Sequence, residues 1–303
     1  MCILKNVKSL ITVNGMWKTY EQRSSLIIFF YLLYIIAIQQ KFNITPFHVR
    51  VFTEIPIGAG LGGSTSFVVC LAACFLYWKN LQSKNPIEFG HDLFSECVKY
   101  YAQFCEEFLQ DYECASVDTN VCIFGNIIKG QLINHTENLE CNYITRMKIL
   151  LIDSNIRQKK WTRAKQMSTL KAETPLELEP ILNTLDNVTI QMYNWLHLIN
   201  NRRKDPNLVN YYRRNNSVQR SFQLIHLLLK QYDLSNEIFN RICETANNMG
   251  FEGLIGFGTR YVYILIPPSI TNDEIEEISM LLKFKNFDVI NTSINCEGMK
   301  LDE

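Results

Sequence analysis

The sequence predicts an α+β protein of two domains, and three observations support this prediction. Segments with apolar residues at spacings of three and four, typical of helices, are mixed along the chain with short apolar runs typical of buried strands. A glycine-rich stretch at residues 56–64 separates one such run from a long apolar helix. A polar connection at 134–142 precedes a change of pattern. We therefore predict domains at residues 1–145 and 146–303.

The composition indicates an intracellular protein without a charged docking surface. With 303 residues, 47% of them hydrophobic, the chain can bury a large core. Thirty basic and thirty acidic residues leave no net charge, so we expect neither a nucleic acid nor a membrane as partner. The ten cysteines follow no metal-ligand spacing and are expected to be reduced thiols. We expect a cytoplasmic location, with the peroxisome left open.

The first half of the chain is predicted to be rich in helices. The apolar run at 26–38 has thirteen residues, fewer than the roughly 20 that span a membrane, so we interpret it as a buried helix; a signal anchor is the alternative. The other elements expected here are strands at 10–13, 48–52, 121–124 and 130–133, and helices at 67–78 and 91–109.

In the second half, longer helices alternate with buried strands. Residues 269–273 offer an N-cap before an acidic first turn, which suits a helix start there. The expected elements are strands at 147–152, 261–266 and 288–293, and helices at 175–202, 206–231, 235–249 and 273–283.

The glycine-rich stretch has the residues that a phosphate-binding loop requires. Glycines at 58, 60, 62 and 63 let backbone N–H groups approach an anion, and the helix that follows directs its positive dipole end at the same place. The hydroxyls of Ser64 and Thr65 could then meet a phosphate or its Mg²⁺. A P-loop would need a lysine after the last glycine, and a dinucleotide fingerprint another spacing. A tight turn of small residues is the alternative interpretation.

This stretch resembles the P-x-G-x-G-L-G-S-S signature of the GHMP kinases, the superfamily of galactokinase, homoserine kinase, mevalonate kinase and phosphomevalonate kinase. The resemblance implies an α+β, two-domain GHMP kinase fold. Its N-terminal domain would be ribosomal-S5-domain-2-like, with the first strands missing, and its C-terminal domain ferredoxin-like. The residues that would bind the phosphates of ATP are Pro56, Gly58, Ala59, Gly60, Leu61, Gly62, Gly63, Ser64 and Thr65.

Two further segments resemble mevalonate kinases in particular. A helix carries Glu106, and A-S-V-D-T at 115–119 is similar to the family's S-G-V-D-N. The resemblance implies that Asp118 is the catalytic aspartate and that Ser64 and Glu106 bind Mg²⁺. It also implies that Thr162, in a W-T-R-A similar to the family's N-T-R-A, is a substrate-binding hydroxyl. Taken alone, Asp118 is typical of a turn and Glu106 of a solvated helix face.

The sequence also departs from the family. The P-G-K and G-E-H segment has no counterpart at residues 1–6. The third glycine motif is reduced to residues 254–260, where Phe257 and Arg260 could narrow the site. Gly63 and Thr119 replace a serine and an asparagine.

The resemblance implies ATP-dependent phosphorylation of (R)-mevalonate to 5-phosphomevalonate in isoprenoid and sterol biosynthesis, with ATP and Mg²⁺ as cofactors. Two alternatives stay open. One is a degenerate or truncated non-catalytic relative, and the other is a GHMP kinase of another small molecule. The expected partner is the small-molecule substrate, and a homodimer is left open.

Overall fold

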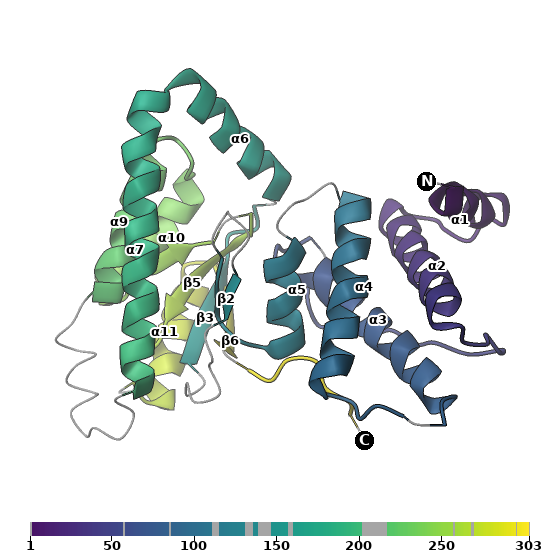
Figure 1. Ribbon diagram of the computed structural model, residues 1–303. Helices are drawn as coiled ribbons and strands as arrows, with labels where there is room; N and C mark the ends of the chain where they lie inside the picture. The colour runs from purple at the N-terminus through teal and green to yellow at the C-terminus, as the bar shows by residue number, and fades with distance from the viewer. Residues whose placement is uncertain are drawn as a thin grey trace. The chain divides into compact units, whose positions relative to one another are not determined.

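The structure is a computed structural model that divides into two compact units (Figure 1). Unit 1 comprises Met1–Glu54, Gly62–Glu137 and Glu297–Glu303, and unit 2 comprises Ile55–Leu61 and Asn138–Cys296. Each unit thus includes a segment that lies outside the domain predicted for its half of the chain. The residues described are 2–56, 58–84, 86–110, 115–130, 136–138, 147–156, 160–201, 217–256, 258–267, 270–294 and 296–302.

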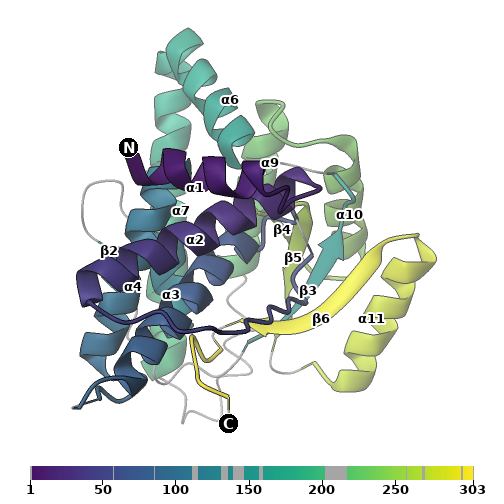
Figure 2. The same cartoon turned by 90° about the vertical axis from the view of Figure 1, so that its right-hand side faces the viewer.

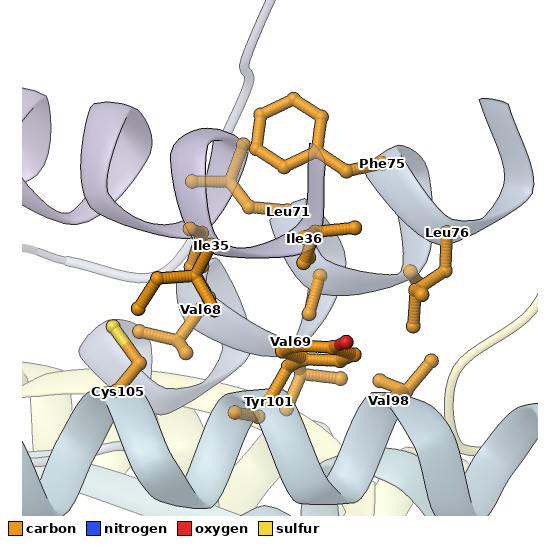
Figure 3. Close-up of a cluster of buried hydrophobic side chains, with 14 of the residues drawn as sticks. Ile35, Ile36, Val68, Val69, Leu71, Phe75, Leu76, Val98, Tyr101 and Cys105 are labelled. Atoms are coloured by element: carbon orange, nitrogen blue, oxygen red, sulfur yellow. The ribbon is translucent and has the colours of Figure 1, made fainter. Parts of the chain in front are cut away.

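Unit 1 is built from helices around one apolar core. Buried side chains of α2, α3 and α4 interdigitate at its centre (Figure 3). The C-terminal segment also packs there, since the Met299 N–H donates to the carbonyl oxygen of Ile123 at 2.9 Å. The elements are α1 (Cys2–Val13), α2 (Tyr20–Gln40), α3 (Gly63–Leu81), α4 (Asp92–Gln110), α5 (Ala115–Phe124), and the short strands β1 (Ile128–Gly130) and β2 (Thr136–Asn138).

Helix α2 is longer than the apolar run that predicted it. It begins at a capping box formed by Thr19 and Gln22 and ends at Lys41, whose φ is 50°. With 21 residues, α2 is long and apolar enough to cross a membrane by length and composition, and so is α3 with 19. The prediction that the run is too short to span is therefore wrong on length. Both helices contribute buried residues to the core of unit 1, and a core helix meets the same criteria.

Two strand predictions in unit 1 are wrong because the patterns were short. Residues 10–13 form the end of α1, where Val7 and Ile11 are buried four residues apart, as on one face of a helix. Residues 48–52 do not form a strand and are mostly exposed. An alternating segment becomes a strand only when it pairs with another.

A third strand prediction is also wrong, because residues 121–124 belong to α5. An apolar run of four residues cannot distinguish a buried strand from a buried helix. Asp118 lies in the first turn, where the helix dipole favours an acid, and Gly125 follows the helix with φ 70°. Of the predicted strand at 130–133, only Gly130 is in β1, and 131–133 lie outside the described residues.

Unit 2 contains an antiparallel sheet in the order β4-β5-β3-β6. The strands and helices predicted for this half are confirmed within a few residues, except that 206–216 lie outside the described residues. The elements are β3 (Met147–Asp153), α6 (Lys160–Glu173), α7 (Pro175–Asn201), α9 (Ser217–Gln231), α10 (Glu237–Asn248), β4 (Gly253–Ile255), β5 (Tyr261–Leu265), α11 (Asn272–Phe284) and β6 (Asp288–Ile294).

The two faces of this sheet have different covers. Leu150 and Ile152 of β3 face α10 and α11, which lie on the same side of the sheet (Figure 2). The alternate residues Ile149 and Leu151 point to the opposite face because successive side chains of a strand alternate. There they pack with Ala59 of the glycine-rich stretch. The sheet of unit 2 therefore supports the first part of the candidate phosphate loop.

Candidate active site

The glycine-rich stretch has the backbone conformation for which glycine is suited. Gly58, Gly60 and Gly62 have φ of 72°, 74° and 76°, in the left-handed region where a side chain is strained. The N–H of Ala59 donates to the carbonyl oxygen of Pro56 at 3.2 Å, which closes a tight turn. The alternation of left-handed glycines with other residues explains why glycine occurs at every second position here.

The first part of the loop is fixed to the turn between β4 and β5 in unit 2. The carbonyl oxygen of Ala59 accepts the Oγ1–H of Thr259 at 2.9 Å and the N–H of Arg260 at 3.2 Å. A Cβ added at Gly60 would overlap the carbonyl oxygen of Gly258 and lie 2.6 Å from the Cα of Thr259. The loop and the turn are thus in direct backbone contact, 200 residues apart in the chain.

Arg260 is directed at a carboxylate of the neighbouring strand. Its guanidinium lies 2.6 Å from Oδ2 of Asp153, and the two side chains are 19% and 10% exposed. The hydrogen bond to the Tyr261 hydroxyl and the charge of Asp153 raise the pKa of Arg260, so it stays charged. We predicted that Arg260 could narrow the phosphate-binding site. Its guanidinium is paired with Asp153, and this ion pair limits where the side chain can lie. Phe257, named with Arg260, lies outside the described residues.

The second part of the loop begins α3 in unit 1. Gly62 is the N-cap and supplies no side-chain hydrogen bond, so the N–H groups of the first turn lack a side-chain cap. Ser64 is exposed in this turn and Thr65 is buried. Uncapped N–H groups at the positive end of a helix form an anion-binding position. This geometry suits a phosphate group.

Helices α3 and α4 run antiparallel in the core of unit 1. Figure 3 shows Val68 of α3 next to Cys105 of α4, while Leu76 of α3 lies next to Val98 of α4. The N-terminal end of α3 and the C-terminal end of α4 therefore lie at the same end of the helix pair.

This arrangement brings the region of Glu106 to the end of the unit that carries Ser64. Glu106 is only 5% exposed, although its neighbour Glu107 is exposed. Burial, and then the charge of Glu106, raise the pKa of the Cys105 thiol to about 12, so this cysteine stays protonated. Glu106 is therefore a buried carboxylate rather than part of a solvated helix face.

Asp118 is partly buried and lies in the first turn of α5, which packs against α3 and α4. Five Cα steps separate the end of α4 at Gln110 from Ala115, at most about 18 Å of chain. The start of α5 therefore lies within about 18 Å of the C-terminal end of α4. The sequence placed Asp118 before a strand, but the structure places it in a helix.

Two polar residues that sequence reasoning did not assign to the site follow Asp118. Thr119 is 0% exposed and Asn120 is 2% exposed. Within the described residues, Oγ1 of Thr119 and Oδ1 of Asn120 have no hydrogen-bond partner. Buried polar atoms are nearly always paired by protein, water or a ligand, so these two oxygens are available to a bound water or ligand. The sequence signal that could have identified them is two polar residues directly before the apolar residues 121–124.

The side chains at this end of unit 1 fit Mg²⁺ chemically. Mg²⁺ prefers oxygen ligands, commonly one or two from the protein with the rest from water and phosphate. The hydroxyl of Ser64 and the carboxylate of Glu106 are ligands of this kind. Within the described residues no three His, Cys, Asp or Glu side chains gather as a metal site. The oxygens of Thr119 and Asn120 add to the polar lining.

Thr162 is the predicted site residue that lies in unit 2. It is exposed near the start of α6, whereas Asp118 belongs to unit 1. The side chains of its neighbours Trp161 and Arg163 lie outside the described residues. Its role as a substrate-binding hydroxyl stays a prediction.

Comparison with known proteins confirms the resemblance to GHMP kinases. Residues 30–125 match the family described as GHMP kinases N terminal domain. The chain is 24% identical to the mevalonate kinase erg12 of Aspergillus fumigatus over 256 residues, which are 82% of this chain and 46% of that protein. The chain thus spans about half the length of this relative.

Solved structures share the fold. A crystal structure of mevalonate kinase superposes with a TM-score of 0.61 at 15% identity, covering 97% of this chain and 81% of that one. The L. major mevalonate kinase in complex with R-mevalonate gives a TM-score of 0.57 at 15% identity, covering 90% and 78%. The predicted α+β, two-domain GHMP kinase fold is confirmed.

Proposed function

We propose that this chain is an ATP-dependent kinase of a small alcohol, with (R)-mevalonate as substrate and 5-phosphomevalonate as product, in isoprenoid and sterol biosynthesis. One observation carries the proposal. The uncapped start of α3, which follows a loop of left-handed glycines, lies at the end of unit 1 that carries Glu106, near the C-terminus of α4, and Asp118 is in the first turn of α5. The names of the relatives, and a structural neighbour that holds R-mevalonate, support the choice of substrate.

The proposed chemistry assigns a part to each group. Backbone N–H groups of the glycine loop and of the first turn of α3 bind the phosphates of ATP. Ser64 and Glu106 would hold Mg²⁺, which when bound neutralises negative charge on the phosphates. Asp118 accepts the proton of the substrate hydroxyl. The hydroxyl oxygen of the substrate attacks the γ-phosphorus of ATP, and ADP leaves. Positioning and charge neutralisation carry most of the acceleration, so no covalent enzyme intermediate is needed.

The direct test is to incubate the purified chain with Mg·ATP and one acceptor at a time, and to follow ADP release. We expect release with (R)-mevalonate well above the rate without acceptor. Galactose and homoserine, acceptors of sister kinases, serve as controls. Release with one of these alone would reassign the substrate within the superfamily. Equal release with and without every acceptor would contradict the kinase proposal.

A non-catalytic relative is the second candidate, and one observation favours it. Where the resemblance expects bare glycine backbone, this chain has the buried Thr259 and a partly buried Arg260–Asp153 ion pair. Calorimetric titration with Mg·ATP separates the two candidates. Binding of Mg·ATP without turnover of any acceptor would support the non-catalytic candidate.

A further inference from the structure

The turn between β4 and β5 carries side-chain and backbone contacts that point beyond fold stability. We propose that Thr259 and Arg260, with Asp153, position the glycine loop so that the N–H of Gly60 is presented to a nucleotide phosphate. This inference rests on the proposed function. In it Thr259 and Arg260 are positioning residues, because they act through the backbone of Ala59.

The first step concerns the carbonyl oxygen of Ala59, which receives two hydrogen bonds. One comes from the hydroxyl of Thr259 at 2.9 Å and the other from the N–H of Arg260 at 3.2 Å. Thr259 is 2% exposed and Ala59 is 1% exposed. Hydrogen bonds that are shielded from water are costly to break without replacement. The orientation of this carbonyl group is therefore fixed by unit 2.

The second step concerns the hydroxyl of Thr259, which acts as donor and acceptor at once. It donates to Ala59 and accepts the N–H of Tyr261, the first residue of β5, at 3.1 Å. A hydroxyl has one donor hydrogen and two acceptor lone pairs, so both bonds are compatible. Valine has the same shape as threonine but can make neither bond. Serine retains both capacities.

The third step concerns Arg260, which is held at its amide, its carbonyl group and its side chain. The amide donates to Ala59, and the guanidinium pairs with Asp153, the last residue of β3, at 2.6 Å. Its carbonyl oxygen accepts the N–H of Ser154 at 2.9 Å and the Oγ–H of Ser154 at 2.6 Å. The donor to Ala59 is therefore tied to the sheet and has little freedom to move with the loop.

The fourth step links this anchor to phosphate binding. Within the described residues there are no cis peptide bonds, so the C=O of Ala59 and the N–H of Gly60 point in opposite directions from one peptide plane. Because the C=O points at Thr259 and Arg260, the N–H of Gly60 points away from them. Gly60 is exposed, and a side chain there would overlap the backbone of Gly258. The anchor thus turns one loop donor outward, as a phosphate site requires.

The test compares Thr259→Val with Thr259→Ser, using Mg·ATP as the probe in calorimetric titration. We expect Thr259→Val to weaken binding about tenfold, as the loss of a buried hydrogen bond typically does, and Thr259→Ser to restore it to within about threefold of the parent chain. Thr245→Val is the matched control, because the partly buried Thr245 donates its hydroxyl to the carbonyl oxygen of Arg241 at 2.8 Å within α10. We expect no change in binding for this control.

A second readout does not depend on nucleotide. Amide hydrogen exchange at Arg260 and Tyr261, whose N–H groups bond to Ala59 and to the hydroxyl of Thr259, should accelerate in Thr259→Val and return in Thr259→Ser. If Thr259→Val does not fold, Asp153→Asn replaces it, with exposed Asp186→Asn as control. For Asp153→Asn we expect about threefold to tenfold weaker binding of Mg·ATP.

The outcomes separate this inference from the proposed function. Tight Mg·ATP binding by the parent chain together with equal binding by Thr259→Val would overturn the inference and leave the kinase proposal intact. Unchanged exchange at Arg260 and Tyr261 in the valine variant would overturn it as well. If the parent chain itself binds no Mg·ATP, the proposed function fails with it, and that failure is recognised without any variant.

Discussion

Two sets of buried polar groups, one in each unit, differ in how they are paired. In unit 2, Thr259 and Ser154 are buried and make the hydrogen bonds that hold Ala59 and Arg260, although Nε of Arg260 is itself unpaired. In unit 1, the buried oxygens of Thr119 and Asn120 have no hydrogen-bond partner among the residues described. Because an unpaired buried polar atom typically costs about 1–3 kcal/mol, such atoms are kept where a ligand can pair them. The paired groups of unit 2 thus fix Ala59 of the glycine loop. The oxygens of Thr119 and Asn120 in unit 1 are available to a ligand or water.

The comparison also separates positioning from chemistry. The polar contacts of unit 2 described above hold backbone groups of the loop and of the turn between β4 and β5, and Gly58 and Gly60 stay exposed. In unit 1, Thr119 and Asn120 follow Asp118 near the start of α5, and Glu106 is near the end of α4. The carboxylates of Glu106 and Asp118 add negative charge there. Carboxylates are needed to bind a divalent cation and to accept a proton. Exposed backbone N–H groups are needed to donate hydrogen bonds to the phosphates. Substitutions in the two units should therefore affect different measurable quantities.

The largest effect is expected at Asp118. Asp118→Asn removes the proton acceptor and keeps the shape, so we expect kcat to fall about 10²- to 10³-fold with little change in the affinity for Mg·ATP. Steady-state ADP release with (R)-mevalonate measures the first quantity and calorimetry the second. Asp92→Asn is the matched control, because Asp92 also lies in the first turn of a unit 1 helix but is exposed. An equal loss in both variants would show that Asp118 acts only through helix stability.

The second effect concerns the charge of Glu106. We expect Glu106→Gln to raise the Mg²⁺ concentration for half-maximal activity about 10- to 100-fold, because the amide is a weaker ligand for a hard cation. Thermal melting without Mg²⁺ checks that the variant still folds. Exposed Glu107→Gln should change neither quantity. An unchanged Mg²⁺ requirement in Glu106→Gln would contradict the assignment of this residue as a metal ligand.

The third effect measures the close approach of the loop to the turn between β4 and β5 within unit 2. Gly60→Ala and Gly250→Ala both place a side chain at positive φ, 74° and 81°, but only at Gly60 does the added Cβ meet other atoms. We expect both to destabilise unit 2, and Gly60→Ala by a further ~1–3 kcal/mol because the loop must move away from Gly258. Urea unfolding followed by far-ultraviolet circular dichroism gives the difference. Equal midpoints for the two variants would mean that the loop is not held against the turn.

The sequence predicted unit 2 well because its signals are local and strong. The helix predicted at 273–283 is α11, and its N-cap Thr271 forms a capping box with Glu274 within the segment named for that role. β3 has four consecutive buried residues, a run too apolar for a loop and too short for a helix. In unit 1 the strand predictions rested on four or five residues each, and α1 and α5 show that packing decided the outcome.

The candidate site could be predicted only in its contiguous parts. The glycine loop and the segment around Asp118 are readable because each fits within about ten residues of chain. The contact between Ala59 and Thr259 spans 200 residues, and no local pattern marks it. The burial of Glu106 was equally hidden, because its neighbour Glu107 is exposed and a helix presents adjacent residues to different surroundings. Long-range backbone contacts and burial require the fold itself.

The smallest effect concerns Glu252 in unit 2. The test is whether its charged carboxylate lowers the free energy of unfolding. Burial raises the pKa of Glu252 above its ordinary value of 4.5, and the charge of His226 opposes this shift. The folded state then binds the proton more tightly than the unfolded chain, so the contribution of Glu252 to stability is lost as pH rises from 4.5 through the folded pKa. Glu252→Gln should weaken this decline slightly, and exposed Glu179→Gln should not. Urea midpoints between acidic and neutral pH measure the slope. A steeper decline in Glu252→Gln would mean that the carboxylate is stabilised by its surroundings, and unit 2 would then keep no costly charge at this position.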